Sequence, residues 1–323
     1  MSTRDDVLRM LEENREIYLS GSRMAQMLGV TRASVWKAVK TLEENGYKIE
    51  AVTNKGYRLS AGNQKLSEYA VRRHLKTKEL GKTLYILESV DSTNNYAKAL
   101  AAEGAPHGTA VAAQMQTGGR GRLGRSFFSP PGAGMYLSVI LRPTVDTDRA
   151  LSVTCAVAVA VCRAVENFIN NSAQIKWVND VYVAGKKICG ILTEAVSDLE
   201  SGSVEFLVVG IGINLTCEAF PPELREIATA LSEHGGERTD CAELIAAVLC
   251  ELEQVYDQLD TAAFMPEYRQ RSCVIGKWVR AIRAGAEREV LIKDIDDNGA
   301  LLVENQAGVP ERINSGEISL RFL

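Results

Sequence analysis

The segment QTGGRGRLGR, residues 116–125, holds the residue types best suited to binding an anion. Its arginines, Arg120, Arg122 and Arg125, alternate with glycines. Arginine supplies a planar fork of donors that matches carboxylate or phosphate, and glycine lets the backbone approach a ligand closely and move. We therefore predict a mobile loop that closes over a multiply anionic ligand. The alternative is a surface loop that binds RNA or has no ligand.

The same segment contains the pattern G-x-G-x-x-G, from Gly119 to Gly124, but its context argues against a Rossmann dinucleotide site. The residues that follow, SFFSPPGAGMYLSVIL, predict a loop with two prolines and then a strand. A pyrophosphate would therefore have no helix N-terminus to bind. The sequence also lacks the G-x-x-x-x-G-K-[ST] phosphate loop.

A second group of polar residues lies in KWVNDVYVAGKKICGIL, residues 176–192, which predicts two strands joined at Ala184–Gly185. A lysine in such a hairpin can neutralise a carboxylate that attacks a phosphate. A carboxylate such as Asp180 can hold a neighbouring donor or Mg²⁺. Taken alone, the segment fits a charged surface hairpin equally well.

Two more segments predict walls of a small-ligand pocket. VVGIGINL, residues 208–215, is an apolar strand that ends in glycines and an asparagine, although a core strand followed by a turn explains it at least as well. DSTNNYA, residues 91–97, places Ser92, Thr93 and Asn94 where a helix begins. These three residues fit either a helix cap or a cluster of groups for a neutral polar ligand.

The elements that must position these residues occupy positions 65–272, where helical and strand patterns alternate. Several strands are adjacent hairpins rather than βαβ units, which favours an α+β domain with a mixed sheet. The helical patterns lie near residues 66–76, 92–104, 149–170 and 240–259. The strand patterns lie near 83–88, 109–115, 135–142, 174–177, 181–184, 187–195 and 204–215. Residues 275–323 contain short strands with Gly and Asn turns, which predict a small SH3-like barrel.

Residues 1–62 predict a winged helix-turn-helix. Helical spacing covers residues 5–16, Ser22 is expected to cap a second helix, and Thr31 begins a third that stops at Gly46. Two alternating strands around TNKG then form the wing. The polar segment SAGNQ, residues 60–64, is a candidate linker.

The third helix has a polar side that suits DNA, because recognition helices place such residues against bases and phosphates. Lys55 and Arg58 of the wing can reach the backbone of the DNA. The candidate DNA-binding residues are Ser22, Thr31, Arg32, Ser34, Lys37, Lys40 and Lys55. A protein-interaction module is the alternative. So small a module implies that the protein binds DNA as a dimer.

The composition is that of a soluble globular protein of two or three domains, with 323 residues, 46% hydrophobic residues and a net charge of −4. Such a charge argues against a nucleic-acid coat protein, although it allows one small DNA-binding module. Seven cysteines and three histidines, without a C-x-x-C pair, give neither a metal site nor a disulfide framework and suit a reducing cytoplasm. The charged start shows no signal peptide, and the apolar stretch 151–161 is too short to cross a membrane. We therefore expect a cytoplasmic protein with no membrane partner.

Together the segments DSTNNYA, QTGGRGRLGR, FFSPPGAGMYLS, KWVNDVYVAGKKICGIL and GIGINL, in this order, resemble the bifunctional biotin–protein ligase and biotin-operon repressor family. The resemblance covers essentially the whole chain. It implies a ligase that makes biotinyl-5′-AMP from biotin and ATP with Mg²⁺, and transfers biotin to a lysine of the biotin carboxyl carrier protein of acetyl-CoA carboxylase. It also implies a biotin-responsive repressor that binds operator DNA as a homodimer when it holds the adenylate.

The resemblance assigns roles to individual residues. Lys187, Arg122 and Asp180 are the expected catalytic residues. The expected ligand-binding residues are Ser92, Thr93, Asn94, Gln116, Gly119, Arg120, Gly121, Arg122, Lys187, Gly190, Gly212 and Asn214. The chain departs from the family pattern at Val178, where K-W-P-N-D has proline, and at Leu123, where a third basic residue is common. Two rival functions stay open, a ligand-sensing repressor without ligase activity and a lipoate or octanoate ligase.

Overall fold

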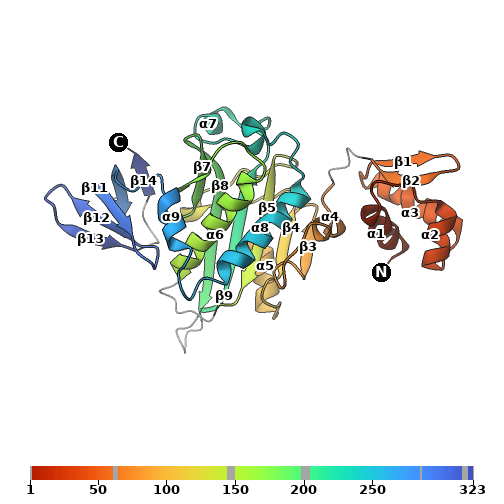
Figure 1. Cartoon of the computed structure of the whole chain (residues 1–323), viewed down its shortest axis with the longest axis horizontal. Helices are drawn as coiled ribbons and strands as arrows, with labels where there is room; N and C mark the ends of the chain where they lie inside the picture. The colour runs from red at the N-terminus through yellow and green to blue at the C-terminus, as the bar shows by residue number, and fades with distance from the viewer. Residues whose placement is uncertain are drawn as a thin grey trace. The chain divides into compact units, whose positions relative to one another are not determined.

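The computed structural model describes residues 2–60, 65–143, 150–197, 204–283, 286–314 and 319–322. Two compact units make up the chain, Met1–Leu75 and Lys76–Leu323 (Figure 1). Each unit has its own hydrophobic core.

The first unit is a helix-turn-helix with a wing, as the sequence predicts. Its helices are α1 (Thr3–Glu13), α2 (Gly21–Leu28) and α3 (Arg32–Glu44), and its wing pairs β1 (Ile49–Val52) with β2 (Gly56–Leu59). The helices enclose a core of fully buried side chains, among them Val7, Leu11, Met24, Val35, Val39 and Leu42. A short helix, α4 (Glu68–Arg72), packs on α1. The apolar spacing in the sequence therefore identifies the buried face correctly.

The start of α2 differs from the prediction. Ser20, not Ser22, is the N-cap, because its backbone is extended and its hydroxyl accepts a hydrogen bond from the backbone N–H of Arg23. Ser22 lies inside the helix and is exposed. The predicted cap of α3 is correct, since Thr31 Oγ1 accepts from the backbone N–H of Ser34 at 3.1 Å.

The second unit is built on a seven-stranded sheet in the order β3-β4-β5-β9-β8-β7-β6. The strands are β3 (Leu84–Leu87), β4 (Ala110–Ala113), β5 (Gly134–Leu141), β6 (Gln174–Lys176), β7 (Asp180–Val183), β8 (Lys186–Ser197) and β9 (Val204–Asn214). Only β3 and β4 pair in parallel among these described strands, and the other pairs are antiparallel. The predicted α+β domain with a mixed sheet is confirmed.

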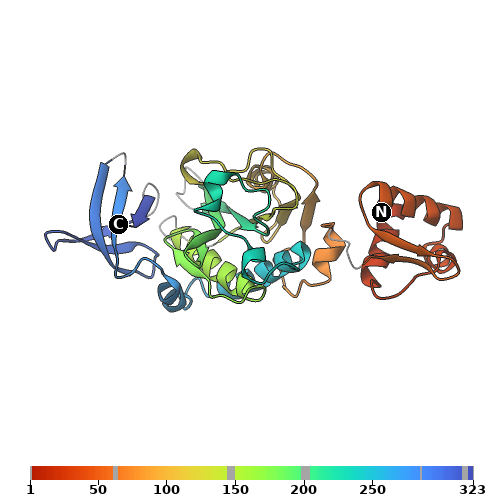
Figure 2. The same cartoon turned by 90° about the horizontal axis from the view of Figure 1, so that it is seen from above.

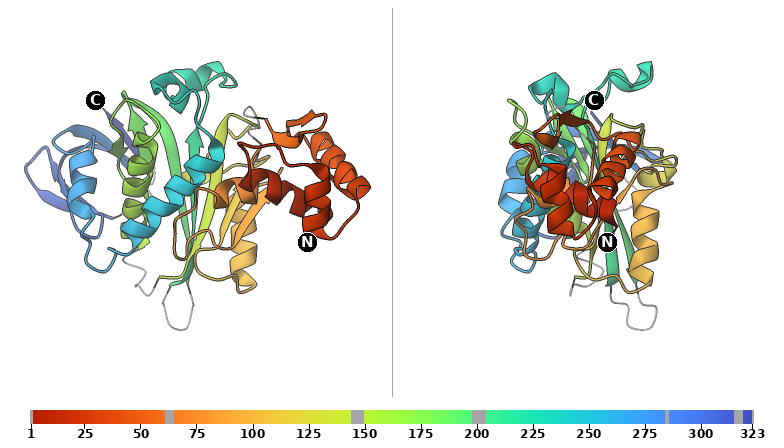
Figure 3. Two further views of the ribbon diagram at one scale, coloured as in Figure 1. Left: turned by 45° about the vertical axis from the view of Figure 1, so that its right-hand side comes forward. Right: turned by 90° about the vertical axis from the view of Figure 1, so that its right-hand side faces the viewer.

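Helices cover both faces of this sheet. Helices α6 (Ala150–Glu166) and α8 (Cys241–Tyr256) pack together on one face, and α5 (Thr93–Ala102) lies on the other (Figures 2 and 3). Val208 of β9 packs in the cluster under α5. Because side chains alternate along a strand, Gly210, Gly212 and Asn214 share this face of β9. The α5 face therefore carries the residues that the sequence singles out.

Two helices of the second unit were not foreseen, α7 (Pro222–Arg225) and α9 (Met265–Arg271). Helix α9 buries Met265 and Tyr268. Arg271 of α9 forms an ion pair with Glu166 of α6 at 2.7 Å, and Glu267 of α9 forms one with Arg163 of α6 at 2.5 Å. These contacts attach α9 to the helical layer.

The end of the chain is an antiparallel five-stranded sheet in the order β13-β12-β11-β10-β14. Its strands are β10 (Trp278–Arg283), β11 (Ala286–Ile295), β12 (Leu301–Asn305), β13 (Pro310–Ile313) and β14 (Ser319–Phe322). The short strand β13 was not predicted. Within the described residues the outer strands β13 and β14 do not pair, so the antiparallel sheet is confirmed while an SH3-like barrel stays a prediction.

The seven cysteines all lie in the described ranges and are all free thiols. Over the same ranges, no group of three or more His, Cys, Asp or Glu side chains could hold a metal ion. None of the described helices has the length and apolar character needed to cross a membrane.

Candidate active site

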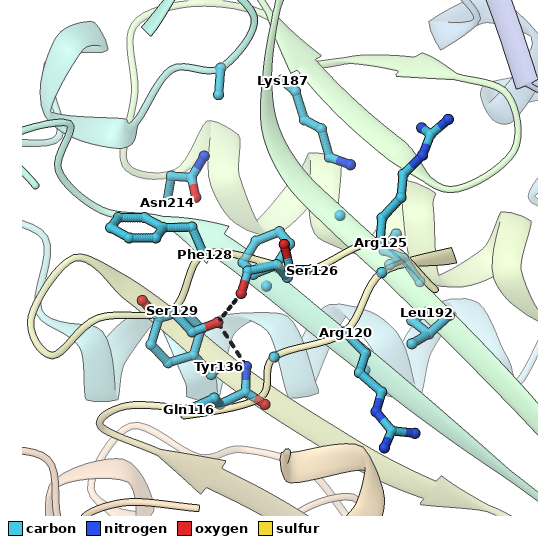
Figure 4. Close-up of a pocket in the computed structure, with 18 of the residues that line it drawn as sticks. Gln116, Arg120, Arg125, Ser126, Phe128, Ser129, Tyr136, Lys187, Leu192 and Asn214 are labelled. Atoms are coloured by element: carbon cyan, nitrogen blue, oxygen red, sulfur yellow. Dashed lines mark hydrogen bonds between the residues drawn. The ribbon is translucent and has the colours of Figure 1, made fainter. Parts of the chain in front are cut away.

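A cavity of about 1170 Å³ opens on the face of the sheet that carries α5 (Figure 4). Its walls come from the start of α5, residues 115–131, strands β7, β8 and β9, and residues 220–228. Every residue expected to bind ligand or catalyse lines it, namely Ser92, Thr93, Asn94, Gln116, Gly119, Arg120, Gly121, Arg122, Asp180, Lys187, Gly190, Gly212 and Asn214. The fold thus brings together segments that are more than 100 residues apart in the chain.

The start of α5 forms a polar wall. Ser92 occupies the N-cap position, but its hydroxyl makes no capping hydrogen bond. The backbone N–H of Thr93 donates to Gln116 Oε1 at 2.8 Å. Ser92 and Thr93 are both buried, so the start of the helix is part of the cavity wall and is not exposed to solvent.

The glycine- and arginine-rich loop is closed at its base by Gln116 and Ser129. The backbone N–H of Gln116 donates to the Ser129 carbonyl at 3.0 Å, and Gln116 Nε2 donates to Ser129 Oγ, also at 3.0 Å (Figure 4). Further along, Gly121 N–H donates to the Arg125 carbonyl at 2.7 Å. A Cβ atom at Gly119 would lie 2.5 Å from Ser129 Oγ, so glycine is required there by close approach of the two loop ends.

Arg122 connects this loop to the lysine-bearing hairpin. Its Nη1 donates to Asn179 Oδ1 at 2.9 Å. Burial lowers the pKa of Arg122, and the nearby Asp180 carboxylate opposes that shift. The guanidinium remains charged at neutral pH, because an arginine does not lose its proton in proteins. A cation is therefore held half-buried at the cavity wall.

Strands β7 and β8 form the predicted hairpin, with Ala184 and Gly185 in the turn at positive φ. Lys187 Nζ lies 2.8 Å from Asp180 Oδ1, and both side chains are partly buried. Asn179 Nδ2 donates to the same Asp180 oxygen at 3.2 Å and to the Ile191 carbonyl at 2.8 Å. Asp180 thus holds Lys187 and Asn179 in fixed positions.

Residues 220–229 lie beside the backbone of Lys187 and were not predicted to take part in the site. The backbone N–H of Lys187 donates to the Ile227 carbonyl at 3.0 Å, and Asn214 Nδ2 donates to the Thr229 carbonyl at 2.9 Å. Phe220 of this segment packs edge-on against Phe128, with ring centroids 6.4 Å apart. The segment has no helical or strand period long enough to indicate a role.

Phe127 explains two of the predicted glycines. Gly190 and Gly212 pair directly across β8 and β9. A Cβ atom at Gly212 would lie 2.6 Å from atoms of the Phe127 ring, and one at Gly190 would lie 3.1 Å from Lys187 Nζ and 3.3 Å from the Phe127 ring. These glycines therefore make room for an aromatic ring at the floor of the cavity.

The cavity is strongly cationic. Its lining includes Arg120, Arg122, Arg125, Lys176 and Lys187. Lys187 and Arg125 lie on one side of the cavity, whereas Arg120 extends toward the opposite side (Figure 4). Burial lowers the pKa of Lys176 and raises the pKa of the neighbouring Tyr182 to about 12. This arrangement suits a ligand with several negative charges.

The first unit presents the residues expected to meet DNA. Arg32, Lys37, Lys40 and Lys55 are exposed, and Lys40 Nζ pairs with Glu43 at 2.6 Å. Arg58 pairs with Glu50 at 2.7 Å and lies over the Tyr18 ring, and Lys55 Nζ lies over the same ring. Arg58 therefore links the wing to the residues before α2, and contact of Lys55 and Arg58 with DNA stays a prediction.

Comparison with known proteins gives three matches along the chain. Residues 86–214 match the biotin/lipoate A/B protein ligase family, residues 3–58 match an HTH domain, and residues 274–321 match the biotin protein ligase C terminal domain. The chain is 37% identical to the bifunctional ligase/repressor BirA of Bacillus spizizenii over 98% of both chains. It is 29% identical to the protein of that name from Escherichia coli, over 94% of this chain and 92% of the relative. A biotin protein ligase from Aquifex aeolicus, solved with biotin and ATP, superposes with a TM-score of 0.65 at 30% identity, over 75% of this chain and 100% of that one.

Proposed function

Because the chain belongs to the family of bifunctional biotin–protein ligases and repressors, we propose that it joins biotin to ATP as biotinyl-5′-AMP and then transfers biotin to a lysine of the biotin carboxyl carrier protein of acetyl-CoA carboxylase. The chain is a biotin–protein ligase with a DNA-binding repressor domain. The observation that carries the proposed chemistry is the convergence of Arg122, Asp180 and Lys187 on one cationic cavity.

In the first step the biotin carboxylate attacks the α-phosphate of ATP, and pyrophosphate leaves. Two anions must meet, so neutralisation of charge and alignment do most of the work. Lys187, held by Asp180, would contact the carboxylate and the phosphate. Arg122 would draw the glycine-rich loop over the adenylate and keep water from the mixed anhydride.

Asp180 is also the carboxylate that would hold Mg²⁺ beside the nucleotide. Mg²⁺ is usually bound by one or two carboxylates together with substrate phosphates and water. Asp180 lines the cavity and has one oxygen engaged by Lys187, so this donor set fits. An ion held there by Asp180 would supply positive charge that offsets the charge of the phosphates.

In the second step the acceptor lysine attacks the acyl carbon of the adenylate, and AMP leaves. This step needs an open path to the cavity for a protein-borne amine. It requires no covalent intermediate on the enzyme, so no nucleophile of this chain takes part.

Release of pyrophosphate from ATP on addition of biotin tests the ligase proposal. We expect pyrophosphate release to depend on biotin. We also expect biotin to be transferred to a purified carrier domain but not to a carrier whose acceptor lysine is changed to arginine. Release that responds to lipoate or octanoate and not to biotin would favour the related acyl ligases. No release with any acid would leave a ligand-sensing repressor.

For the repressor role, we propose that the adenylate-bound protein dimerises and occupies a two-fold operator. The ligand then raises operator affinity because it binds the dimerising state more tightly. A mobility-shift titration with and without biotin plus ATP tests this coupling. Equal operator affinity in both titrations would contradict it.

We also propose that strands β10–β14 close into an SH3-like barrel. Support comes from the family match at residues 274–321 and from the five short antiparallel strands. An experimental structure in which β13 and β14 lie far apart would contradict this closure.

A further inference from the structure

Beneath the cavity floor, four side chains from three elements form a continuous hydrogen-bonded chain. Asn94 Nδ2 donates to Glu194 Oε2 at 2.8 Å. Ser138 Oγ lies 2.6 Å from Asn94 Oδ1 and 2.7 Å from Thr93 Oγ1. Thr93, Asn94 and Ser138 are buried. Thr93 and Asn94 line the cavity, whereas Glu194 lies outside the lining, so these hydrogen bonds link a carboxylate outside the cavity to the ligand space.

The chemistry of these groups fixes the direction of each hydrogen bond. An ionised carboxylate only accepts, so Asn94 must turn its NH₂ group toward Glu194 and its oxygen toward Ser138. The same NH₂ group also donates to the Leu192 carbonyl at 3.2 Å, which uses both of its protons.

Ser138 has one hydroxyl proton, and the amide oxygen of Asn94 can only accept it. The remaining short contact, between Ser138 and Thr93, then needs the proton of Thr93. Gln116 Oε1 lies farther from Thr93 Oγ1, at 3.1 Å, and already accepts the Thr93 backbone N–H. The Thr93 hydroxyl therefore donates into the floor and turns its lone pairs toward the cavity.

Gly210 shows that the fold makes space for this chain. A Cβ atom at Gly210 would collide with the amide group of Asn94. All the donors and the oxygen of Asn94 are used within the protein. Asn94 also lines the cavity, but with both of its N–H donors used within the protein it has no donor left for a ligand.

We infer that Glu194 is a positioning residue which, through Asn94 and Ser138, makes the Thr93 hydroxyl an obligatory hydrogen-bond acceptor, so that the ligand must offer an N–H group there. This inference rests on the proposed ligase function. Biotin has N–H groups only in its ureido ring, and its carboxylate belongs at the cationic side with Lys187. Since the family resemblance already assigns Thr93 to ligand binding, the ureido ring is the part of biotin expected to meet Thr93, and Glu194 determines that Thr93 accepts a hydrogen bond there. The dithiolane ring of lipoate has no N–H group, so this wall selects biotin over lipoate.

A double-mutant cycle between Glu194→Gln and Thr93→Val tests the inference. Lys98 Nζ lies 2.5 Å from Glu194 Oε1 and only donates. In Glu194→Gln, Lys98 would therefore bind the amide oxygen of the new side chain, and the NH₂ group would face Asn94. Each hydrogen bond from position 194 to Thr93 would then have its donor and acceptor exchanged. We expect Glu194→Gln to raise the dissociation constant for biotin about tenfold, as for one lost hydrogen bond, and to raise the biotin KM but not the ATP KM.

Thr93→Val removes the hydroxyl through which Glu194 acts. In that background, Glu194→Gln should change biotin affinity by less than about twofold. If the two substitutions act independently, so that the double variant binds biotin about a hundredfold more weakly than the parent, the inference is overturned. Unchanged biotin affinity in Glu194→Gln alone would also overturn it. Ser138→Ala, which interrupts the chain at another point, should also lose its effect in the Thr93→Val background and gives a second test if Glu194→Gln folds poorly.

Lys98→Gln is the matched control, because it changes the ion pair and leaves the Glu194 carboxylate on Asn94. Biotin affinity within about twofold of the parent is expected. A loss as large as that of Glu194→Gln would assign the effect to the ion pair and overturn the inference. Absence of biotin binding to the unaltered protein is a separate outcome, which would overturn the proposed function and this inference with it.

Discussion

The ammonium group of Lys187 lies 2.8 Å from the carboxylate of Asp180, across the pairing of β7 with β8. Asn179, the residue before Asp180, accepts a hydrogen bond from Arg122. The lysine and the arginine are thus held by neighbouring side chains of one hairpin. A phosphate that enters the cavity meets cations whose positions are already set, so little reorganisation is needed at the moment of reaction.

Lys187→Ala should reduce biotin-dependent pyrophosphate release by roughly a hundredfold or more, as for removal of one group that stabilises developing charge. Lys186→Ala is the matched control, because Lys186 is the adjacent lysine and donates to the Arg225 carbonyl. Its activity should stay near that of the parent. Equal loss in both variants would point to damage of the hairpin rather than to loss of a catalytic group.

Arg122→Gly should release the adenylate before transfer, because the loop loses its hydrogen bond to Asn179. We expect more free biotinyl-AMP after the protein is removed by filtration, and more biotin attached to lysines of unrelated proteins. Leu123→Ala is a suitable comparison, since Leu123 is 60% exposed. Retention of the adenylate in Arg122→Gly equal to that of the parent would remove Arg122 from the closure of the loop.

Gly212→Ala should weaken biotin binding at least tenfold and destabilise the protein by about 1–3 kcal/mol, the usual cost of overpacking. The new methyl group would meet the Phe127 ring. Phe127→Leu in the same chain should restore part of the lost stability. Thermal unfolding and calorimetry of biotin binding measure both effects, and additive losses in the double variant would contradict the proposed clash.

Lys37→Ala and Arg32→Ala should each weaken DNA binding to a similar degree whatever the DNA sequence. Each should also reduce the slope of log affinity against log salt concentration by about one. Ligase activity should not change. Arg9→Ala on α1 is the control, because Arg9 pairs with Asp6 and Glu13 of its own helix. Operator affinity that falls only with Arg9→Ala would exclude α3 as the reading helix.

The imidazole of His107 predicts a pH dependence of stability. Burial lowers the pKa of His107 below its ordinary 6.5, so in acid the unfolded chain takes up a proton that the folded protein resists. The stability is full above about pH 6.5 and falls as the pH drops below it, down to the folded pKa. Urea unfolding between about pH 7.5 and pH 5.5 should show this fall, and His107→Gln should reduce it. An equal fall in the variant would assign the effect to other groups.

Local sequence determined much of this protein. Apolar spacing placed α3 and its buried face, alternation placed the β7–β8 hairpin with its turn at Ala184–Gly185, and the ordered motifs identified the residues that line the cavity. These signals succeed because helix and strand periods, turns and caps depend on neighbours a few residues away. The prediction of Ser22 instead of Ser20 as the cap of α2 is a local error, since either serine could cap the helix and only the backbone conformation decides.

Tertiary structure decided what each side chain contacts. The sequence predicts that Asn94 binds ligand, and Asn94 does line the cavity, but only the structure shows that its amide also forms hydrogen bonds with Glu194, Leu192 and Ser138. Gly212 is expected to line the pocket, and only the fold shows that it makes room for Phe127. Glu194 is one hundred positions from Asn94, and no local pattern can indicate a hydrogen bond over that separation. Such pairs exist only once the sheet and α5 have packed, because burial then leaves each polar group to find its partner inside the protein.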